Sequence, residues 1–173
     1  MPLLIRGESN EKAEQKATAM LTRVGLAHRI KHRPAEKGLI VLISKIEQLS
    51  EYVEEVPEIA WDLVDFAEDP LTVIYPKGKN VSAHLLGPDG SIAIRLVKDE
   101  FCKGLIYRYQ RGLVSTSANI SGEPSPIDFE SISGSIKEQV DYILKNPNPV
   151  KGNKKPSKIV KLGLGGDYSL IRG

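Results

Sequence analysis

The chain has 173 residues, 40% hydrophobic and 27% charged, which is ordinary globular composition and excludes disordered and fibrous classes. A single cysteine, Cys102, cannot form an internal disulfide, and the three histidines lack zinc-site spacing, so we expect no bound structural metal. No apolar run approaches the roughly 20 residues of a membrane span, and the early polar residues argue against a secretory signal, which predicts a soluble, cytoplasmic protein without membrane contact.

The first forty residues predict a helix and a strand. Apolar residues recur at helical spacing over 10–23, behind the capping oxygens of Ser9 and Asn10. A basic stretch, 28–37, then leads into the apolar and β-branched run 38–43. This run is predicted to be a buried strand with a cationic loop before it.

Two helices and a second strand should follow. The segment from Ser44 to Glu47 has the form of a capping box, which predicts a helix start. Pro57 suits the first turn of the next helix, which Pro70 stops. Residues 71–75, LTVIY, are predicted to be a strand.

The next segment predicts a strand, a helix and another strand. Apolar residues alternate along 91–97, so Arg95 should project from the face opposite to the isoleucines. Asp99 can cap a helix that Gly112 ends, and 113–116 should return as a strand. The apolar residues predicted to be buried by this helix are Phe101, Cys102, Leu105, Ile106 and Tyr109.

The C-terminal part predicts short helical pieces over 128–139, a strand at 140–144, a basic linker at 146–156, and two strands at 158–162 and 168–173. The glycines of 163–166 are best explained as a turn between the last two strands. No internal repeat is visible, so we expect a single domain over residues 1–173.

Three features could bind a ligand. The loop 117–126, SANISGEPSP, directly follows a strand and carries hydroxyl, amide and backbone N–H donors, although any tight loop has this composition. Cations between Lys31 and Lys37 could clamp a polyphosphate or form a solvated basic loop. Arg95 in a strand must face solvent, a partner or a ligand. Ser157, following a proline, is by itself best explained as part of a turn.

Several segments together carry a resemblance to a known family. LVSTSANISGEPSP (113–126) closely resembles the serine-rich motif of YrdC-like proteins, and KHRPAEKGLIVLI (31–43) resembles their Lys-x-Arg segment. DPLTVIYPKGKN, SIAIRL, and KPSKIVKL with SLIRG resemble further family segments in the same order. Residues 1–30 are atypical, because no counterpart of the family's YPTETVYGLG segment is found there. The chain thus resembles the YrdC-type threonylcarbamoyl-AMP synthase family in its single-domain form.

The resemblance implies an α/β fold, a single-domain twisted open mixed sheet with flanking helices around a basic concave ligand site. It implies a nucleotidyltransferase that makes threonylcarbamoyl-AMP and pyrophosphate from L-threonine, bicarbonate and ATP, for threonylcarbamoyladenosine modification of tRNA. Mg²⁺ would accompany ATP as substrate, without a permanent protein-bound metal. The implied partners are tRNA or double-stranded RNA and the tRNA threonylcarbamoyl-transferase proteins, and the chain would be a monomer or a homodimer.

The resemblance also implies residue roles, carried over position by position. Catalytic cations would be Lys31 and Arg33. The ATP-binding residues would be Lys31, Arg33, Ser91, Ser117, Asn119, Ser125 and Arg172. The residues that bind threonine or the carbamate would be Lys37, Arg95, Ser115 and Ser157. Two alternatives stay open, a non-catalytic YrdC-like RNA-binding module and a nucleotide-binding remnant without turnover, and the net charge of +2 gives little support to nucleic-acid binding.

Overall fold

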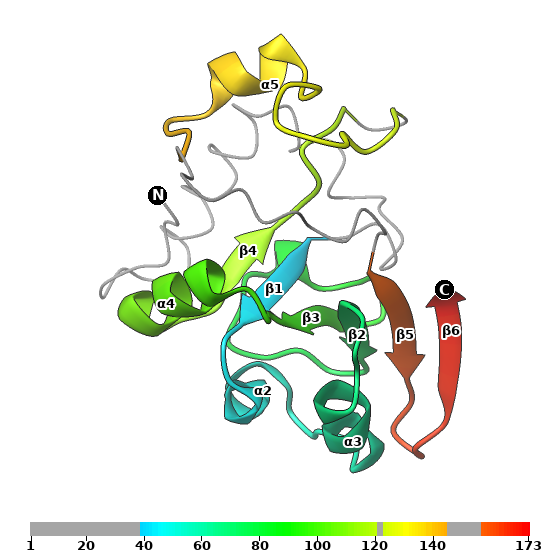
Figure 1. The fold of residues 1–173 in the computed structure, drawn as a ribbon. Helices are drawn as coiled ribbons and strands as arrows, with labels where there is room; N and C mark the ends of the chain where they lie inside the picture. The colour runs from blue at the N-terminus through cyan, green and yellow to red at the C-terminus, as the bar shows by residue number, and fades with distance from the viewer. Residues whose placement is uncertain (1–38, 121–122, 145–156) are drawn as a thin grey trace. The chain divides into compact units, whose positions relative to one another are not determined.

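A computed structural model of the chain describes residues 39–120, 123–144 and 157–173 (Figure 1). Cα packing divides the chain into a sheet unit, His32–Thr116 with Pro156–Gly173, and a loop unit, Met1–Lys31 with Ser117–Lys155. The predicted helix at 10–23 and the cationic residues Lys31, Arg33 and Lys37 lie outside the described residues. A single domain over the whole chain stays a prediction.

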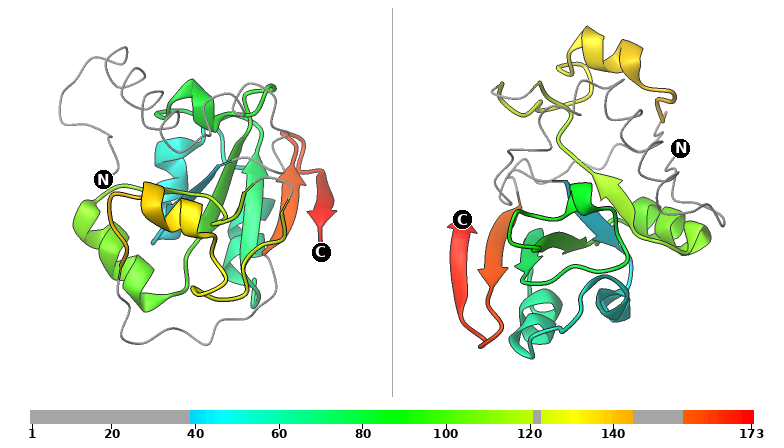
Figure 2. Two further views of the ribbon diagram at one scale, coloured as in Figure 1. Left: turned by 90° about the horizontal axis from the view of Figure 1, so that it is seen from above. Right: turned by 180° about the vertical axis from the view of Figure 1, so that it is seen from behind.

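The described part of the sheet unit contains a mixed six-stranded sheet in the order β4-β1-β3-β2-β5-β6. Its strands are β1 (Ile40–Ile43), β2 (Leu71–Tyr75), β3 (Ile92–Leu96), β4 (Leu113–Ser115), β5 (Lys158–Leu162) and β6 (Tyr168–Arg172). The β1–β3 and β2–β5 pairs are parallel and the other three pairs are antiparallel. Strands β4 and β6 are the two edges of the sheet, and Figures 1 and 2 show β6 beside β5. The prediction of an open mixed α/β sheet is confirmed.

Short helices connect these strands. They are η3 (Ile46–Gln48), α2 (Leu49–Tyr52), α3 (Ile59–Asp65), η4 (Ala83–Leu85) and α4 (Glu100–Tyr109), and the described part of the loop unit contains α5 (Gly134–Gln139). Asp99 caps α4 as predicted, because its carboxylate accepts the backbone N–H of Cys102 at 2.8 Å. Every helix in the described ranges is too short or too polar to cross a bilayer.

The predicted capping box before α2 is wrong in one residue. The side-chain oxygen of Gln48, and not that of Glu47, accepts hydrogen bonds from the backbone N–H groups of Ser44 at 2.9 Å and Lys45 at 3.2 Å. The reason is that the chain enters through the 3₁₀ turn η3, which shifts the side chain facing the free N–H groups by one position.

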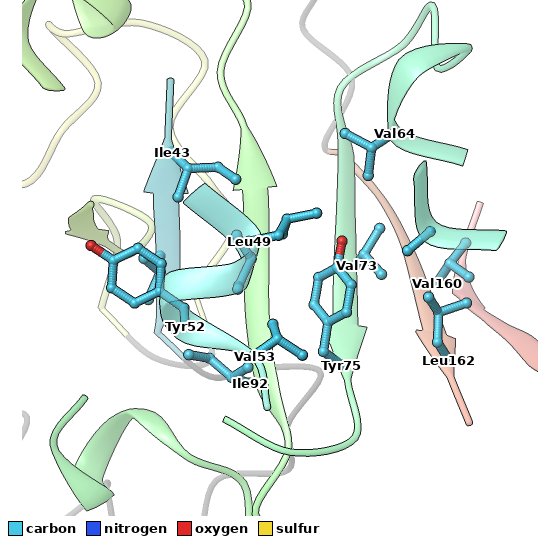
Figure 3. Close-up of a cluster of buried hydrophobic side chains, with 13 residues drawn as sticks. Ile43, Leu49, Tyr52, Val53, Val64, Val73, Tyr75, Ile92, Val160 and Leu162 are labelled. Carbon is cyan, nitrogen blue, oxygen red and sulfur yellow. The ribbon is translucent and has the colours of Figure 1, made fainter. Parts of the chain in front are cut away.

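One face of the sheet is packed against α2 and α3 (Figure 3). Alternate side chains of β1, β2, β3 and β5 point to this face, as the period of two in a strand requires. The buried cluster consists of Val41, Ile43, Leu49, Tyr52, Val53, Ala60, Val64, Val73, Tyr75, Ile92, Ile94, Val160 and Leu162. Since the cluster draws on four strands and both helices, it holds the sheet unit together and fixes the strand register.

The opposite face of the sheet carries the intervening residues. A smaller buried cluster there contains Ile74, Ala93 and Ile159, with Ile40 packed against it. Arg95 lies two residues beyond Ala93 and therefore on this same face, as predicted. The second face thus combines an apolar centre with charged side chains.

Two sequence predictions are wrong. Of the predicted buried residues of α4 only Ile106 is fully buried, whereas Phe101 is 47% and Leu105 45% exposed. The helix contacts β1 near the edge of the sheet, so a narrow stripe of its surface meets protein.

Residues 140–144 form no strand, and Tyr142 is 77% exposed, because none of the described strands pairs with them.

Candidate functional site

Two arginines from different strands converge on Ser157 in the sheet unit. Arg95 of β3 donates from Nη2 to the Ser157 hydroxyl at 2.9 Å. Arg172 of β6 donates to the Ser157 carbonyl from Nε at 3.0 Å and from Nη2 at 2.8 Å, and Nη2 also reaches the hydroxyl at 3.2 Å. Three residues that the sequence predicted separately therefore form one hydrogen-bonded cluster.

Thr72 of β2 completes this cluster and was not among the site residues predicted from the sequence. Its Oγ1 accepts from Arg95 Nε at 3.1 Å and lies 3.1 Å from the Ser157 hydroxyl oxygen. Thr72 is 1% exposed and Ser157 4% exposed. A threonine within an otherwise apolar buried strand was the available signal, because a buried hydroxyl needs a partner.

The strand register explains why these side chains meet. Ile159 of β5 lies opposite Thr72 of β2 on one side and opposite Arg172 of β6 on the other. Residues directly opposite one another in a sheet project to the same face. Thr72 and Arg172 therefore share the face of Arg95, and Ser157 stands just before β5 at the same end of the row.

Neither arginine of the cluster is neutralised by a carboxylate within the described ranges. The described ion pairs join Lys103 to Glu100, Lys158 to Asp69 and Lys161 to Asp89. Burial, and secondly the charge of Arg172, lower the pKa of Arg95. Two neighbouring guanidinium groups without an acid are suited to bind an anion. In the same part of the chain, no three His, Cys, Asp or Glu side chains gather as metal ligands would.

Ser115 lies on the same face as this cluster. It is opposite Ile40 of β1, and Ile40 is in turn opposite Ala93 of β3. Its strand β4 is separated from β3 by β1, and no described hydrogen bond joins Ser115 to Arg95. A ligand that bridges the two positions would have to extend across β1.

Ser91 belongs to a second hydrogen-bonded group. Its hydroxyl donates to Asp89 Oδ1 at 2.5 Å, and Lys161 Nζ donates to Asp89 Oδ2 at 2.7 Å. These two hydrogen bonds, with that of Lys161 the larger cause, hold the pKa of Asp89 well below its usual range. Ser91 is 1% exposed, so its hydroxyl is occupied by Asp89 and covered by protein in this structure.

The remaining predicted site residues lie in the loop unit. The side-chain Nδ2 of Asn119 donates to the carbonyls of Ile120 at 3.2 Å and Glu123 at 2.8 Å, which folds the loop on itself. Its Oδ1 is buried without a partner among the described residues. Ser117 and Ser125 are exposed. The described part of 117–126 contains no helix or strand, as predicted.

Comparison with solved structures supports the fold. A two-residue variant of Sua5 from P. abyssi superposes with a TM-score of 0.71 at 28% identity, covering 91% of this chain and 46% of that chain. The P. abyssi Sua5 complexed with L-threonine superposes with a TM-score of 0.69 at 26% identity, covering 94% of this chain and 44% of that one. The chain therefore spans less than half the length of these structures.

Comparison with protein sequences agrees with the structural match. A protein from Pseudoalteromonas translucida named threonylcarbamoyl-AMP synthase is 33% identical over 133 residues, which are 75% of this chain and 70% of that protein. The model of the Sua5–YciO–YrdC family, described as telomere recombination, matches residues 23–173. The resemblance carried by the sequence motifs is confirmed: this chain belongs to the Sua5–YciO–YrdC family.

Proposed function

We propose that the chain is an L-threonylcarbamoyladenylate synthase, a cytoplasmic nucleotidyltransferase that serves threonylcarbamoyladenosine modification of tRNA. It would make threonylcarbamoyl-AMP and pyrophosphate from L-threonine, bicarbonate and ATP. The observation that carries the proposal is the convergence of Arg95 and Arg172 on Ser157, in a family with relatives named for this product.

In this proposal Arg95 and Ser157 of the cluster bind the amino-acid substrate, and Arg172 of the same cluster faces the nucleotide. L-threonine and its N-carboxy derivative carry carboxylate or carbamate groups that accept hydrogen bonds from guanidinium and hydroxyl donors. Arg95 and Ser157 would hold these groups, with Ser115 on the same face, and Lys37 would bind them too. The complex of the P. abyssi relative with L-threonine supports an amino acid as ligand of this fold.

The nucleotide would be bound by Lys31, Arg33, Ser117, Asn119, Ser125 and Arg172, and Ser91 would join them by exchanging its hydrogen bond to Asp89 for one to the nucleotide. A carbamate oxygen of N-carboxythreonine attacks the α-phosphorus of ATP, the bond to the β-phosphate oxygen breaks, and pyrophosphate leaves with the electron pair. Negative charge grows on the phosphate oxygens in this step, so the positive charges of Lys31 and Arg33 would lower its barrier. Mg²⁺ enters with ATP as part of the substrate and neutralises pyrophosphate charge.

The direct test incubates the purified protein with ATP, Mg²⁺, bicarbonate and labelled L-threonine. We expect threonylcarbamoyl-AMP and pyrophosphate in equal amounts, both dependent on threonine. Arg95→Ala should raise the KM for L-threonine at least about tenfold, because a guanidinium bond to an anion contributes about 1.5–3 kcal/mol. Arg108→Ala, on α4, is the matched control and should leave the KM for L-threonine and the KM for ATP unchanged.

Other outcomes of the same assay would replace the proposal. ATP binding without either product would make the chain a nucleotide-binding remnant. Lys31→Ala or Arg33→Ala would then abolish ATP binding, with no turnover to lose. Binding of double-stranded RNA with a steep loss of affinity in salt, and no turnover, would make it an RNA-binding module. The tRNA threonylcarbamoyl-transferase proteins and tRNA are proposed partners, and a homodimer is tested by light scattering.

A further inference from the structure

Thr72 has no role in the ligand site so far, although it contacts two of its proposed residues. It lies in β2, 1% exposed, with its hydroxyl oxygen 3.1 Å from both Arg95 Nε and Ser157 Oγ. We propose that Thr72 is the positioning residue of the amino-acid site, whose hydroxyl fixes the Arg95 guanidinium and the Ser157 hydroxyl relative to one another. This inference rests on the proposed function.

Hydrogen-bond counting gives the direction of each bond. A hydroxyl oxygen has two acceptor lone pairs and one hydrogen. Ser157 Oγ accepts from Arg95 Nη2 at 2.9 Å and from Arg172 Nη2 at 3.2 Å, which uses both lone pairs. Either hydroxyl could donate across the 3.1 Å contact with Thr72, and this count assigns Ser157 as the donor.

The same count applied to Thr72 makes the cluster donor-rich. Its Oγ1 accepts from Arg95 Nε and from the Ser157 hydroxyl, so both of its lone pairs are also used. No hydroxyl lone pair remains in the cluster to accept a bond from a ligand, whereas guanidinium N–H groups remain to donate. The cluster therefore selects a ligand group that only accepts hydrogen bonds, such as a carboxylate or a carbamate, over an ammonium or amide N–H.

Removal of the Thr72 hydroxyl would change this selection without creating a cavity. Valine has nearly the same shape as threonine but offers no lone pair. The Nε–H of Arg95 and the hydroxyl hydrogen of Ser157 would both lose their acceptor, and each side chain could rotate to find another. A binding site loses affinity when its side chains must be ordered by the ligand.

A purely structural role makes a different prediction. If Thr72 only satisfies the buried Nε–H of Arg95, Thr72→Val lowers the melting temperature and leaves the kinetic constants as they are. If Thr72 positions the site, Thr72→Val raises the KM for L-threonine, and Thr72→Ser, which keeps the hydroxyl, restores it. Ser169→Ala on β6 removes a hydroxyl outside the cluster and serves as control.

The kinetic experiment measures KM for L-threonine, KM for ATP, kcat and melting temperature for the four proteins. We expect Thr72→Val to raise the KM for L-threonine about tenfold or more, which corresponds to about 1.4 kcal/mol, with the KM for ATP changed less than about twofold. Thr72→Ser and Ser169→Ala should stay within about threefold of the unchanged protein. An unchanged KM for L-threonine in an active, folded Thr72→Val overturns the inference.

A second measurement separates the inference from the proposed function. The ¹H–¹⁵N resonance of Arg95 Nε, assigned with Arg95→Lys, should be protected from exchange in the unchanged protein and in Thr72→Ser, and lost in Thr72→Val. L-threonine affinity measured by calorimetry should fall in the same variant. Absence of product in the unchanged protein overturns the proposed function, whereas an Arg95 resonance that persists in Thr72→Val overturns the role of Thr72.

Discussion

Two buried tyrosines of the same core differ in the fate of their hydroxyls. Tyr52 accepts the backbone N–H of Gly112 at 2.7 Å, whereas the Tyr75 hydroxyl has no partner among the described residues (Figure 3). An unpaired buried hydroxyl destabilises the folded state, and loss of a paired one leaves its partner unsatisfied. We expect Tyr75→Phe to raise the free energy of unfolding by about 1 kcal/mol and Tyr52→Phe to lower it by about 1–3 kcal/mol, measured by urea denaturation.

Alkaline titration provides an independent check on Tyr75. Burial raises the pKa of Tyr75 above the ordinary tyrosine value, so the folded state retains the proton that the unfolded chain releases. The contribution of Tyr75 ionisation to the free energy of unfolding is constant below about pH 10. As the pH rises above that value, the free energy of unfolding should fall. The loss of stability above that pH should be smaller in Tyr75→Phe, and an identical alkaline slope in both proteins would contradict this account.

Asp89 links stability to acid pH. The hydrogen bonds from Lys161 and Ser91 lower the pKa of its carboxyl, so the stabilisation is present above the ordinary aspartate value of about 3.9 and is lost as the pH falls below it. Asp89→Asn should lower the urea midpoint at pH 7 and reduce the difference between the urea midpoints at pH 7 and pH 3. Lys161→Met should do the same, and a double-mutant cycle should give a coupling below about 1 kcal/mol, because the pair is half exposed.

At the level of elements, two glycines on either side of the end of α4 differ in whether a side chain would fit. A Cβ at Gly112 would lie 2.7 Å from Val41 Cγ1 and 3.1 Å from the Leu42 carbonyl oxygen, both in β1. A Cβ at Gly104, inside α4, would meet nothing within 4 Å. We expect Gly112→Ala to lower the free energy of unfolding by about 1–3 kcal/mol and Gly104→Ala to raise it by about 0.5–1 kcal/mol.

Thermal denaturation of the two variants tests this contrast within one segment of the chain. The result for Gly112 would show that the turn after α4 is built by close approach to β1, which sets where β4 enters the sheet. Equal stabilities for both variants would mean that β1 can move aside, and would contradict a close approach of Gly112 to β1.

At the scale of the whole molecule, the net charge of +2 limits binding to nucleic acid. Non-specific affinity grows with the number of phosphates that lysine and arginine neutralise. We expect the protein to bind double-stranded RNA no tighter than about 0.1 mM at physiological salt, measured by fluorescence anisotropy. A micromolar affinity that falls steeply between low and physiological salt would contradict this and favour the RNA-binding alternative.

The sequence predicted most elements of the sheet unit because local patterns decide them. LTVIY is β2 over the same residues, and Asp99 caps α4 as predicted. The errors occur where a neighbour decides the outcome. The burial of α4 depends on which surface the sheet offers, and a strand at 140–144 requires a partner that periodicity cannot reveal.

The sequence by itself determined the family and the mixed sheet, through several short motifs in the family's order. It also determined Arg95, Ser157 and Arg172 as candidate site residues, because each of the three lies in such a motif. Only the tertiary structure decided that these three meet at one point with Thr72 between them. The reason is physical: the cluster joins β2, β3 and β6, and strand register, set by burial of the opposite face, is a long-range property that no local segment encodes.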